Sequence, residues 1–408
     1  MERILLTGAD LVLPDRVAAN HTLVIEEGRI ADISTGLRTV SSGERRIDLT
    51  GFLIVPGFVD VHVHGVLGRD VQDGAGSIAA IAAELPRYGV TAFCPTTVAC
   101  TPEALTTVLA EVRALRAEPN LDAARVLPAH LESNFISPEF CGAQPMECLR
   151  SPRSRVQGSR SEGQGPSETF SGDDILNVVN DFRPDVSIMT VAPELDNGLE
   201  LVRSLAEAGI IVSLGHSAAG YEQSLAAIAA GARQATHLFN RMTPMTHRDP
   251  GMVGAILGSD DVAAEIICDG HHVHPAVMRV AIDAKTPSRI MAITDGTAGS
   301  GLPRGSKARL GGRTITVEEV ARLDDRTMAG SVLTMDRAFA CMVGQVGAGL
   351  VDGVRMCSTT PASELGLQGH GVLATGAVAD LVVLDANLTV RQTWIGGRLI
   401  FNNLSVSE

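Results

Sequence analysis

Aromatic and basic side chains are both scarce in this sequence. Aromatic residues make up 3% of its 408 residues, with one tryptophan and two tyrosines, so Ala, Val, Leu and Ile must build most of the core. The 33 Lys and Arg residues are outnumbered by 47 Asp and Glu, which gives a formal net charge of −14. Nucleic-acid-binding proteins usually present a basic face, and no Lys/Arg-rich run is present, so we expect no nucleic-acid partner.

Long apolar runs and paired cysteines are also missing. No run of 18 or more apolar residues occurs, so we expect no membrane-spanning helix. The N-terminal sequence MERILLTGADLVLPD has charged residues too early for a signal peptide and lacks a small-residue cleavage site. The seven cysteines include no C-x-x-C pair, and an odd number in so long a chain argues against a disulfide framework. These features predict reduced thiols and a cytoplasmic protein.

Both ends of the chain have the pattern of β structure, whereas the middle does not. Residues 1–55 contain apolar or alternating runs separated by Gly, Asp and Asn turns. Residues 371–408 contain three more such runs, and Gly396-Gly397 between the last two suits a hairpin turn. Because chain termini often lie close together, we expect residues 1–55 and 371–408 to form one small β-sandwich domain. Residues 56–370 then form the second domain.

The middle of the chain alternates strand-like and helix-like segments. Helical patterns occupy, for example, residues 77–89, 102–118 and 275–285. Eight strand-like runs in this alternation predict a parallel sheet closed as an α/β (β/α)8 TIM-like barrel, and no G-x-G-x-x-G supports the alternative of an open sheet. The expected strands are 59–63, 91–95, 125–130, 187–191, 210–214, 234–237, 263–268 and 289–294. The Ser/Gly/Arg-rich segment 151–172 is expected to be a mobile excursion from the barrel.

Most of the 11 histidines fall at or beyond the ends of the expected strands. His62 and His64 alternate with valines in the first strand, so both side chains point to one face. In a barrel the carboxyl ends of the strands meet at one rim, where active sites form. The other polar residues expected at this rim are Glu132, His216, His237, Asn240, Asp269, His271, His272, His274 and Asp295.

This ring of residues has both a functional and a structural interpretation. A single histidine or glutamate at a strand end is most often a hydrogen-bonded loop residue. Together, Glu132, His216 and His237 form a nitrogen and oxygen set suited to a divalent metal, and His62 with His64 forms a second candidate pair. Asp295 suits either a helix cap or turn, or a general base that faces a metal-bound water.

Seven stretches of the sequence resemble the N-acetylglucosamine-6-phosphate deacetylases of the metal-dependent amidohydrolase superfamily. They lie between about residues 55 and 335, and the β-rich ends also fit the composite β domain of that family. The segment from ATHLFN to RDPG is the most specific, whereas the H-x-H pair alone marks only the superfamily. The stretches are PGFVDVHVHG, HLESNFISPEFCGAQP, VSLGHSAA, ATHLFNRMTPMTHRDPG, ICDGHHVHP, ITDGTAGSGLP and MAGSVLTM.

The resemblance implies a metal centre at the rim. Glu132, His216 and His237 would hold the catalytic divalent ion, and His62 and His64 would hold a second one, since some members of the family use one ion and others two. Zn, Fe, Co and Mn all suit such ligands. Other superfamily members bridge two metals with a modified lysine, but only Lys285 and Lys307 are present here, and neither lies at a strand end. The bridging or anchoring carboxylate must therefore be Glu132.

The resemblance also implies the chemistry and its substrate. Asp295 would be the catalytic acid/base, and His272 would polarise the carbonyl of an acetamide, giving acetate and an amino-sugar phosphate. Arginine suits a phosphate because its planar guanidinium pairs with two oxygens. The expected substrate-binding residues are Asn240, Arg241, Arg248, His272 and Ala143. The family further implies a homodimer.

Four positions depart from the family pattern near the expected substrate pocket. Ser133 and Asn134 follow Glu132 where the family usually has Gly-Pro, which changes backbone freedom there. Gln144 stands where a histidine commonly reaches the sugar, and Arg241 stands where alanine is usual. The metal ligands are intact, so these changes leave the identity of the sugar open.

Three functions are compatible with these observations. The first is metal-dependent deacetylation of N-acetylglucosamine 6-phosphate or a close N-acetylamino-sugar phosphate. The second keeps the amidohydrolase chemistry but acts on another N-acyl sugar or a small cyclic amide. The third is a barrel that binds a sugar phosphate without catalysis, and an intact Asp295 argues against it.

Overall fold

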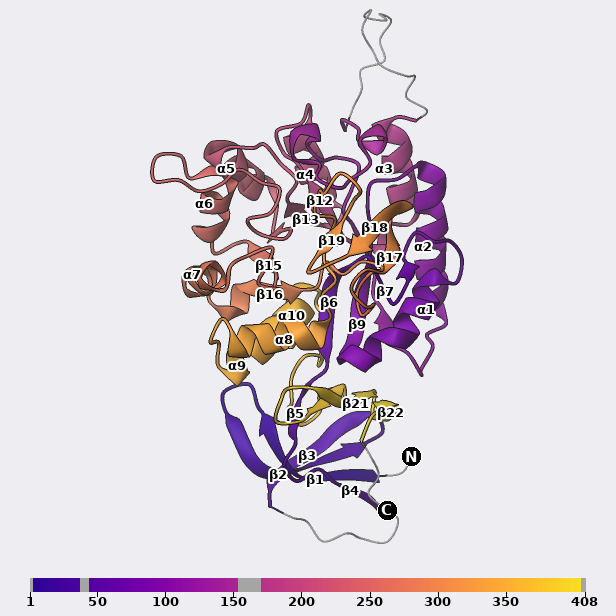
Figure 1. The fold of residues 1–408 in the computed structure, drawn as a ribbon, viewed down its shortest axis with the longest axis vertical. Coiled ribbons are helices and arrows are strands. Elements are labelled where there is room, and N and C mark those ends of the chain that lie inside the picture. The colour runs from indigo at the N-terminus through magenta and orange to yellow at the C-terminus, as the bar shows by residue number, and fades with distance from the viewer. Residues whose placement is uncertain (1–2, 37–43, 153–169, 405–408) are drawn as a thin grey trace, which may run out of the picture.

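The computed structural model describes residues 3–36, 44–152 and 170–404. Most of the 151–172 segment, expected to be an excursion, lies outside these described residues. Figure 1 shows a barrel ringed by helices above a smaller β domain. Strands from both ends of the chain lie in that lower part.

The barrel consists, within the described residues, of eight successive parallel strands, of which the third is split in two. Its strands are β6 (Phe58–Val63), β9 (Val90–Thr97), β10 (Arg125–Val126) with β11 (Ala129–Leu131), β12 (Val186–Val191), β13 (Ile211–Leu214), β14 (Gln234–Ala235), β15 (Ala263–Ile267) and β16 (Ile290–Ile293). The last strand meets the first through two backbone hydrogen bonds, from Asp295 N to the His62 carbonyl (2.9 Å) and from His64 N to the Gly296 carbonyl (2.7 Å). The predicted barrel is confirmed.

Helices cover the outside of the barrel (Figure 1). At the N-terminus of α2 (Pro102–Ala117), the Thr101 hydroxyl accepts a hydrogen bond from Ala104 N, and Pro102 also suits the first turn. Its buried residues, Leu105, Val108, Leu109 and Val112, follow the spacing of one helix face. The helices are α1 (Ser77–Glu84), α2 (Pro102–Ala117), α3 (Gly172–Asp181), α4 (Gly198–Glu207), α5 (Tyr221–Ala230), α6 (Gly251–Leu257), α7 (Pro275–Lys285), α8 (Met335–Gly344), α9 (Leu350–Val354) and α10 (Thr360–Glu364).

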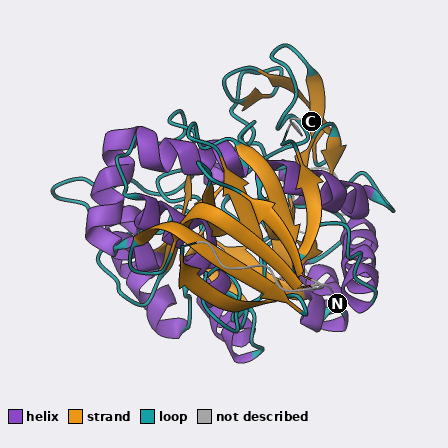
Figure 2. Cartoon of the chain, turned by 90° about the horizontal axis from the view of Figure 1, so that it is seen from below, coloured by secondary structure: helices purple, strands orange, loops and turns teal. Residues whose placement is uncertain are grey.

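The two ends of the chain form one hydrogen-bonded sheet, seen from below in Figure 2, which confirms that they join in one β unit. Its strands are β1 (Arg3–Val12), β2 (Val17–Glu26), β3 (Arg29–Thr35), β4 (Glu44–Asp48), β5 (Leu53–Pro56), β20 (Leu381–Leu384), β21 (Val390–Ile395) and β22 (Arg398–Asn402). The two ends meet where β20 pairs antiparallel with β5, with Val382 opposite Val55. The single tryptophan, Trp394, is buried in the core of this unit. The exact domain boundaries stay a prediction.

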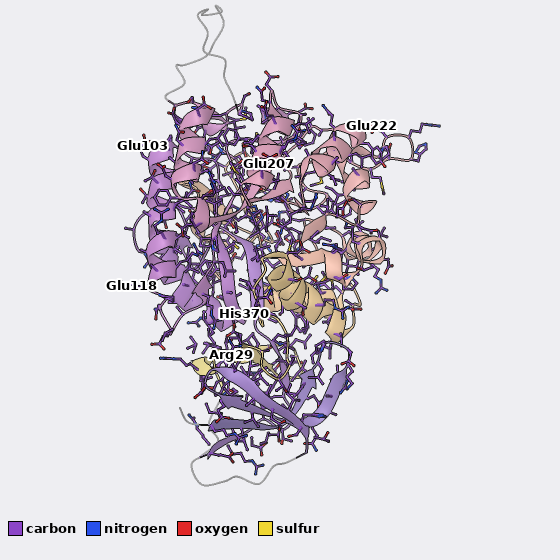
Figure 3. The ribbon with its side chains drawn as sticks, turned by 180° about the vertical axis from the view of Figure 1, so that it is seen from behind. Arg29, Glu103, Glu118, Glu207, Glu222 and His370 are labelled. Carbon is purple, nitrogen blue, oxygen red and sulfur yellow. The ribbon has the colours of Figure 1, made fainter. Side chains whose placement is uncertain are left out.

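Asp380 joins the β unit to the barrel. Its carboxylate accepts hydrogen bonds from His370 Nδ1 (2.9 Å), Gly396 N (2.7 Å) and the Arg125 guanidinium of β10. Figure 3 shows His370 near the boundary between the two parts. A buried carboxylate with three donors is well satisfied, so this contact fixes the β20–β22 strands against the barrel.

A small sheet near the barrel mouth was not expected from the sequence. It consists of β17 (Lys307–Leu310), β18 (Arg313–Val317) and β19 (Ala321–Arg322). It contacts a hairpin from much earlier in the chain, formed by β7 (Gly65–Val66) and β8 (Arg69–Asp70). Arg313 Nη1 donates to the Ala143 carbonyl (2.8 Å), and Gly311 N donates to Asp70 Oδ2 (3.0 Å). The small sheet is thereby tied to loops at the carboxyl ends of the barrel strands.

Acidic side chains are exposed on the outer helices. Figure 3 labels Glu103, Glu118, Glu207 and Glu222 on or beside the outer helices, and all four are exposed. Among the described helices, none combines the length and the apolar character that crossing a membrane requires. The seven cysteines, all of which the structure describes, are free thiols.

Candidate active site

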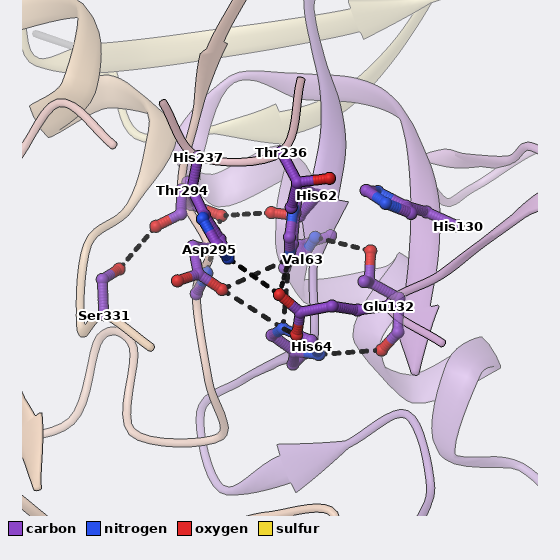
Figure 4. A network of polar contacts seen from close by, with 12 residues as sticks. His62, Val63, His64, His130, Glu132, Thr236, His237, Thr294, Asp295 and Ser331 are labelled. Atoms are coloured by element: carbon purple, nitrogen blue, oxygen red, sulfur yellow. Dashed lines mark hydrogen bonds and ion pairs between the residues drawn. The ribbon is translucent and has the colours of Figure 1, made fainter. Parts of the chain in front are cut away.

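Five predicted ligands converge at the carboxyl ends of the barrel strands, although they are far apart in the sequence. His62 lies in β6 and His64 directly follows it, Glu132 follows β11, and His216 and His237 follow β13 and β14. All five side chains are nearly or fully buried. Figure 4 shows four of them, together with Asp295, around one central point.

Glu132 lies between two histidine pairs. Its Oε1 atom is 2.8 Å from His216 Nε2 and 2.9 Å from His237 Nε2. Its Oε2 atom lies 3.5 Å from His64 Nε2, whereas His62 Nε2 lies 3.9 Å from Oε1. The ligand atoms of Glu132, His216 and His237, and those of His62, His64 and Glu132, lie within 4.8 Å of one another in each set. Both predicted metal sets are therefore brought together, with the carboxylate common to the two.

Hydrogen bonds at Nδ1 orient three of these histidines. His62 Nδ1 lies 2.9 Å from Glu265 Oε2, and His64 Nδ1 lies 3.0 Å from the Thr96 carbonyl. His216 Nδ1 lies 2.7 Å from the Phe140 carbonyl. A carbonyl or an ionised carboxylate can only accept, so each Nδ1 carries a proton, and each ring that gives up its other proton offers an Nε2 lone pair to the centre.

The donor set fits a cation. The Nε2 atoms of His216 and His237 lie only 3.1 Å apart, and those of His62 and His64 only 3.2 Å apart. Lone pairs that face each other and two carboxylates at these distances repel, unless protons or a metal ion lie between them. Imidazole nitrogens and a carboxylate are also the ligands that Zn, Fe, Co and Mn use in proteins.

The pKa values of the site histidines show which of them hold protons between the carboxylates. Burial alone would lower the pKa of His64 and His237, yet hydrogen bonds to Asp295 and Glu132 raise each pKa to about 9. Burial alone would raise the pKa of Glu132, but the charge and hydrogen bond of His216 hold it well below its ordinary value. Two protons thus balance two carboxylates here, and a divalent cation can replace them because metal binding releases protons from its ligands.

Four site residues have a backbone conformation that side chains seldom adopt. The φ angles of His216, His237, Arg241 and Asp295 are 47°, 30°, 52° and 47°. Non-glycine residues with positive φ are uncommon and cost free energy, and they cluster at functional sites. For His237 this also explains why β14 ends at Ala235, two residues before the predicted end, since the chain leaves the strand to turn the imidazole inward.

Asp295 and His272 both face the centre. Asp295 Oδ1 lies 3.2 Å from His64 Nε2 and 3.4 Å from His62 Nε2, so this carboxylate belongs to the cluster rather than to a helix cap. His272 lines the same pocket, and its Nδ1 lies 2.6 Å from Asp269 Oδ2. Asp269 thereby fixes the ring through Nδ1 and leaves the other ring nitrogen of His272, Nε2, available to a substrate in the pocket.

Of the predicted substrate-binding residues, all but Arg248 line this pocket. Ala143, Asn240 and Arg241 share it with Gly142, Leu310, Met328 and Gly330. The Arg241 guanidinium lies against Gly142, where an added Cβ would be 2.8 Å from Arg241 Nε. Arg248 is exposed in the turn from Thr246 to Asp249 and is not part of the lining.

The departures from the family pattern differ in position. Asn134 is buried, and its Nδ2 donates to the Cys100 and Cys148 carbonyls, both at 2.7 Å. Ser133 donates to the Thr190 carbonyl. Neither residue lines the pocket. Their hydrogen bonds instead hold the chain directly after Glu132 against three neighbouring segments. Gln144 and Arg241, in contrast, do line it.

Sequence reasoning missed the buried acids that support the ligands. Glu265 lies inside β15 and contacts His62, and Asp60 accepts from Thr294 Oγ1 (2.6 Å) between β6 and β16. Burial raises the pKa of both carboxyls to about 7. A single acid inside an apolar strand, as in AAEII and FVDVHV, is the signal that would have indicated them, because a buried charge needs a partner.

The chain is similar to known deacetylases along almost its whole length. It matches the amidohydrolase family over residues 53–400. It is 34% identical over 382 residues to an N-acetylglucosamine-6-phosphate deacetylase from Lysinibacillus sphaericus, with 92% of each chain covered. It is 35% identical, also over 382 residues, to an N-acetylgalactosamine-6-phosphate deacetylase from Escherichia coli O157:H7, covering 93% of this chain and 94% of that one.

A solved structure shows the same architecture. It is a mutant of N-acetyl-D-glucosamine-6-phosphate deacetylase from Mycobacterium smegmatis in complex with N-acetyl-D-glucosamine-6-phosphate. The two structures have a TM-score of 0.87 and 31% sequence identity, over 98% of this chain and 100% of that chain. The similarity therefore includes both the barrel and the β unit.

Proposed function

This chain belongs to the amidohydrolase family, and from that premise we propose that it deacetylates N-acetylglucosamine 6-phosphate to glucosamine 6-phosphate and acetate. The observation that carries the proposal is the arrangement of Glu132 between two histidine pairs, opposite Asp295, in a pocket that also holds Arg241. The enzyme is thus a metal-dependent carbohydrate deacetylase that hydrolyses an amide.

We assign the metal ligands by their contacts. Glu132, His216 and His237 would hold one divalent ion, and His62 and His64 together with Glu132 would hold a second. When bound, such a centre makes water a nucleophile at neutral pH and polarises a carbonyl. The ligand types suit Zn, Fe, Co or Mn.

Asp295 and His272 carry out the proton chemistry. The Asp295 carboxylate takes a proton from the attacking water and returns it to the leaving amide nitrogen, so that the C–N bond breaks to an amine and acetate. His272, in its imidazolium form, donates a hydrogen bond from Nε2 to the carbonyl oxygen as negative charge develops there, while its Nδ1–H stays bonded to Asp269. Asp269 holds this ring in place through Nδ1, and one such donor contributes about 3 kcal/mol to transition-state stabilisation.

Arg241 is the pocket cation best placed for the phosphate. It lines the pocket beside Asn240 and Ala143, whereas Arg248 lies on the exposed turn. A phosphate contact by Arg248 therefore requires a second copy of the chain or a movement of its turn. The homodimer and the cytoplasmic location stay predictions.

Acetate release from three sugars tests this function. We expect turnover of N-acetylglucosamine 6-phosphate, at least tenfold lower kcat/KM for unphosphorylated N-acetylglucosamine, and loss of activity on chelation that added metal restores. The 6-phosphate of N-acetylgalactosamine is the second candidate substrate, because a relative named for it is as similar as the others. Equal turnover of phosphorylated and unphosphorylated sugar, or no acetate from any of them, would contradict the proposal.

Two variants then assign the roles. Glu132→Gln should abolish acetate release, because the carboxylate common to both histidine pairs is lost. Arg241→Met should lower kcat/KM for the phosphorylated sugar and leave that for the unphosphorylated sugar unchanged. Arg248→Met is the matched control for a cation outside the pocket.

A further inference from the structure

Gln144 makes two hydrogen bonds that leave only one orientation for its amide. The side chain is buried, and its Oε1 atom accepts from the Ala99 backbone N–H at 2.8 Å. Since a backbone N–H can only donate, the amide oxygen must face Ala99. The NH2 group therefore faces Glu132, and Gln144 Nε2 donates to Glu132 Oε2.

The two oxygens of Glu132 have different neighbours. Oε1 lies within 2.9 Å of the Nε2 atoms of His216 and His237. Oε2, the oxygen held by Gln144, is the one nearer to His64 Nε2, at 3.5 Å. A carboxylate oxygen has two lone pairs, so Oε2 can accept from Gln144 and still present its other lone pair on the side of His64.

The backbone that carries Gln144 is itself fixed. The Ala143 carbonyl accepts from Arg313 Nη1 (2.8 Å), and Gln144 N donates to the Cys141 carbonyl (3.1 Å). In the same segment the Phe140 carbonyl orients His216 through Nδ1. The 140–144 segment thus supports ligands of both metal sets from one piece of backbone.

We propose that Gln144 is a positioning residue of the metal centre that keeps Glu132 turned so that Oε1 faces the His216/His237 pair and Oε2 faces His64. Without this hydrogen bond the carboxylate can rotate until both oxygens face the His216/His237 pair. The His62/His64 pair then loses its share of the carboxylate, and the second ion with it. The inference rests on the proposed function only in taking Glu132 as a metal ligand.

Metal binding to Gln144→Met tests this without reference to turnover. Methionine has a similar length but no donor. Metal-free protein is titrated with Co²⁺ and Zn²⁺, and bound metal is counted after dialysis. We expect two ions per wild-type chain, and in the variant one tightly bound ion with the second bound about 10–100-fold more weakly. The Co²⁺ absorption spectrum of the first ion should also change, because its carboxylate contact changes.

The chain offers a matched control. Gln234 on β14 is also fully buried, and its amide has no hydrogen-bond partner among the described residues. Gln234→Met should therefore keep two ions and the wild-type Co²⁺ spectrum. Gln144→Leu, a smaller replacement, repeats the experiment if the methionine variant does not fold, as judged by circular dichroism.

The outcomes separate the inference from the proposed function. Two ions bound with wild-type affinity by Gln144→Met, an equal loss in Gln234→Met, or a single ion in the wild type would each overturn it. A wild type that binds two ions and a Gln144→Met variant that keeps one would support it, even if neither protein released acetate. In that last case the substrate assignment fails and the positioning role stands.

Discussion

At the scale of single residues, the partner of each histidine Nδ1 atom decides what its Nε2 atom can do. Among the four histidines assigned as metal ligands, His62 has a carboxylate partner there, Glu265, whereas His64 and His216 contact backbone carbonyls. A carboxylate makes the imidazole a stronger ligand than a carbonyl does. His237 Nδ1 has no hydrogen-bond partner in the described part of the chain.

Glu265→Gln should therefore weaken metal binding at the His62/His64 pair. The amide keeps the shape of the side chain but removes the negative charge behind His62, and we expect about tenfold lower affinity for the second ion. Competition with a chelator of known affinity measures it. Unchanged affinity would show that Glu265 has only a packing role.

Asp295→Asn should lower kcat by about 10²–10⁴-fold, the range for loss of a general acid/base. The amide fills the same space but cannot take up a proton. Steady-state acetate release gives kcat, and the ion bound at the His216/His237 pair is counted in the same sample to show that it remains. A kcat within tenfold of the wild-type value would assign the proton transfer to another group.

At the scale of secondary-structure elements, the barrel strands were predictable and the small sheet at the mouth was not. All eight predicted strands appear, because buried parallel strands are short apolar runs between helices. The β17–β19 sheet has polar, partly exposed strands, and its position depends on contacts such as that of Arg313 with Ala143. Such long-range contacts leave no local pattern in the sequence.

The same distinction applies to the site. His62, His64, Glu132, His216 and His237 were predictable because polar residues at strand ends must meet at one rim. Gln144 was noticed only as a departure from a family pattern. Its contact with Glu132 depends on the path of a loop, and loop paths are set by many weak contacts rather than by periodicity.

Arg313→Ala should raise KM about fivefold and leave kcat nearly unchanged. The Arg313 hydrogen bond fixes the loop whose Gly142 and Ala143 line the pocket, and one hydrogen bond is worth about 1 kcal/mol. Initial-rate kinetics with the phosphorylated sugar measure this. Arg322→Ala, on the outer strand of the same sheet, is the control and should keep the wild-type KM. A fall in kcat alone would contradict the role.

At the scale of the whole molecule, the barrel and the β unit depend on each other through Asp380. Breaking a buried ion pair costs about 3–5 kcal/mol, and less when one partner is partly exposed. Arg125 is 31% exposed, so Asp380→Asn should lower the free energy of unfolding by about 2–3 kcal/mol. Urea denaturation at neutral pH measures this loss.

The same variant predicts a pH dependence. Burial alone would raise the pKa of Asp380, but the hydrogen bond from His370 and the charge of Arg125 outweigh it, so the pKa is lowered. A carboxyl with a lowered pKa stabilises the fold fully above its unfolded-state pKa of about 4, and this stabilisation is lost as the pH falls through the folded-state value. The stability difference between wild type and Asp380→Asn should therefore shrink below about pH 4. A difference that grew in acid would contradict this.

The pairing of β5 with β20 has a consequence for biosynthesis. A ribosome releases the chain at about 5–20 residues per second, so roughly 15–65 s pass between the emergence of β5 and of β20. During that interval the nascent N-terminal strands present an open edge, which is where chains associate wrongly. Completion of this sheet therefore comes late, after the whole barrel has been synthesised, and nascent copies on one messenger are exposed to one another until it happens.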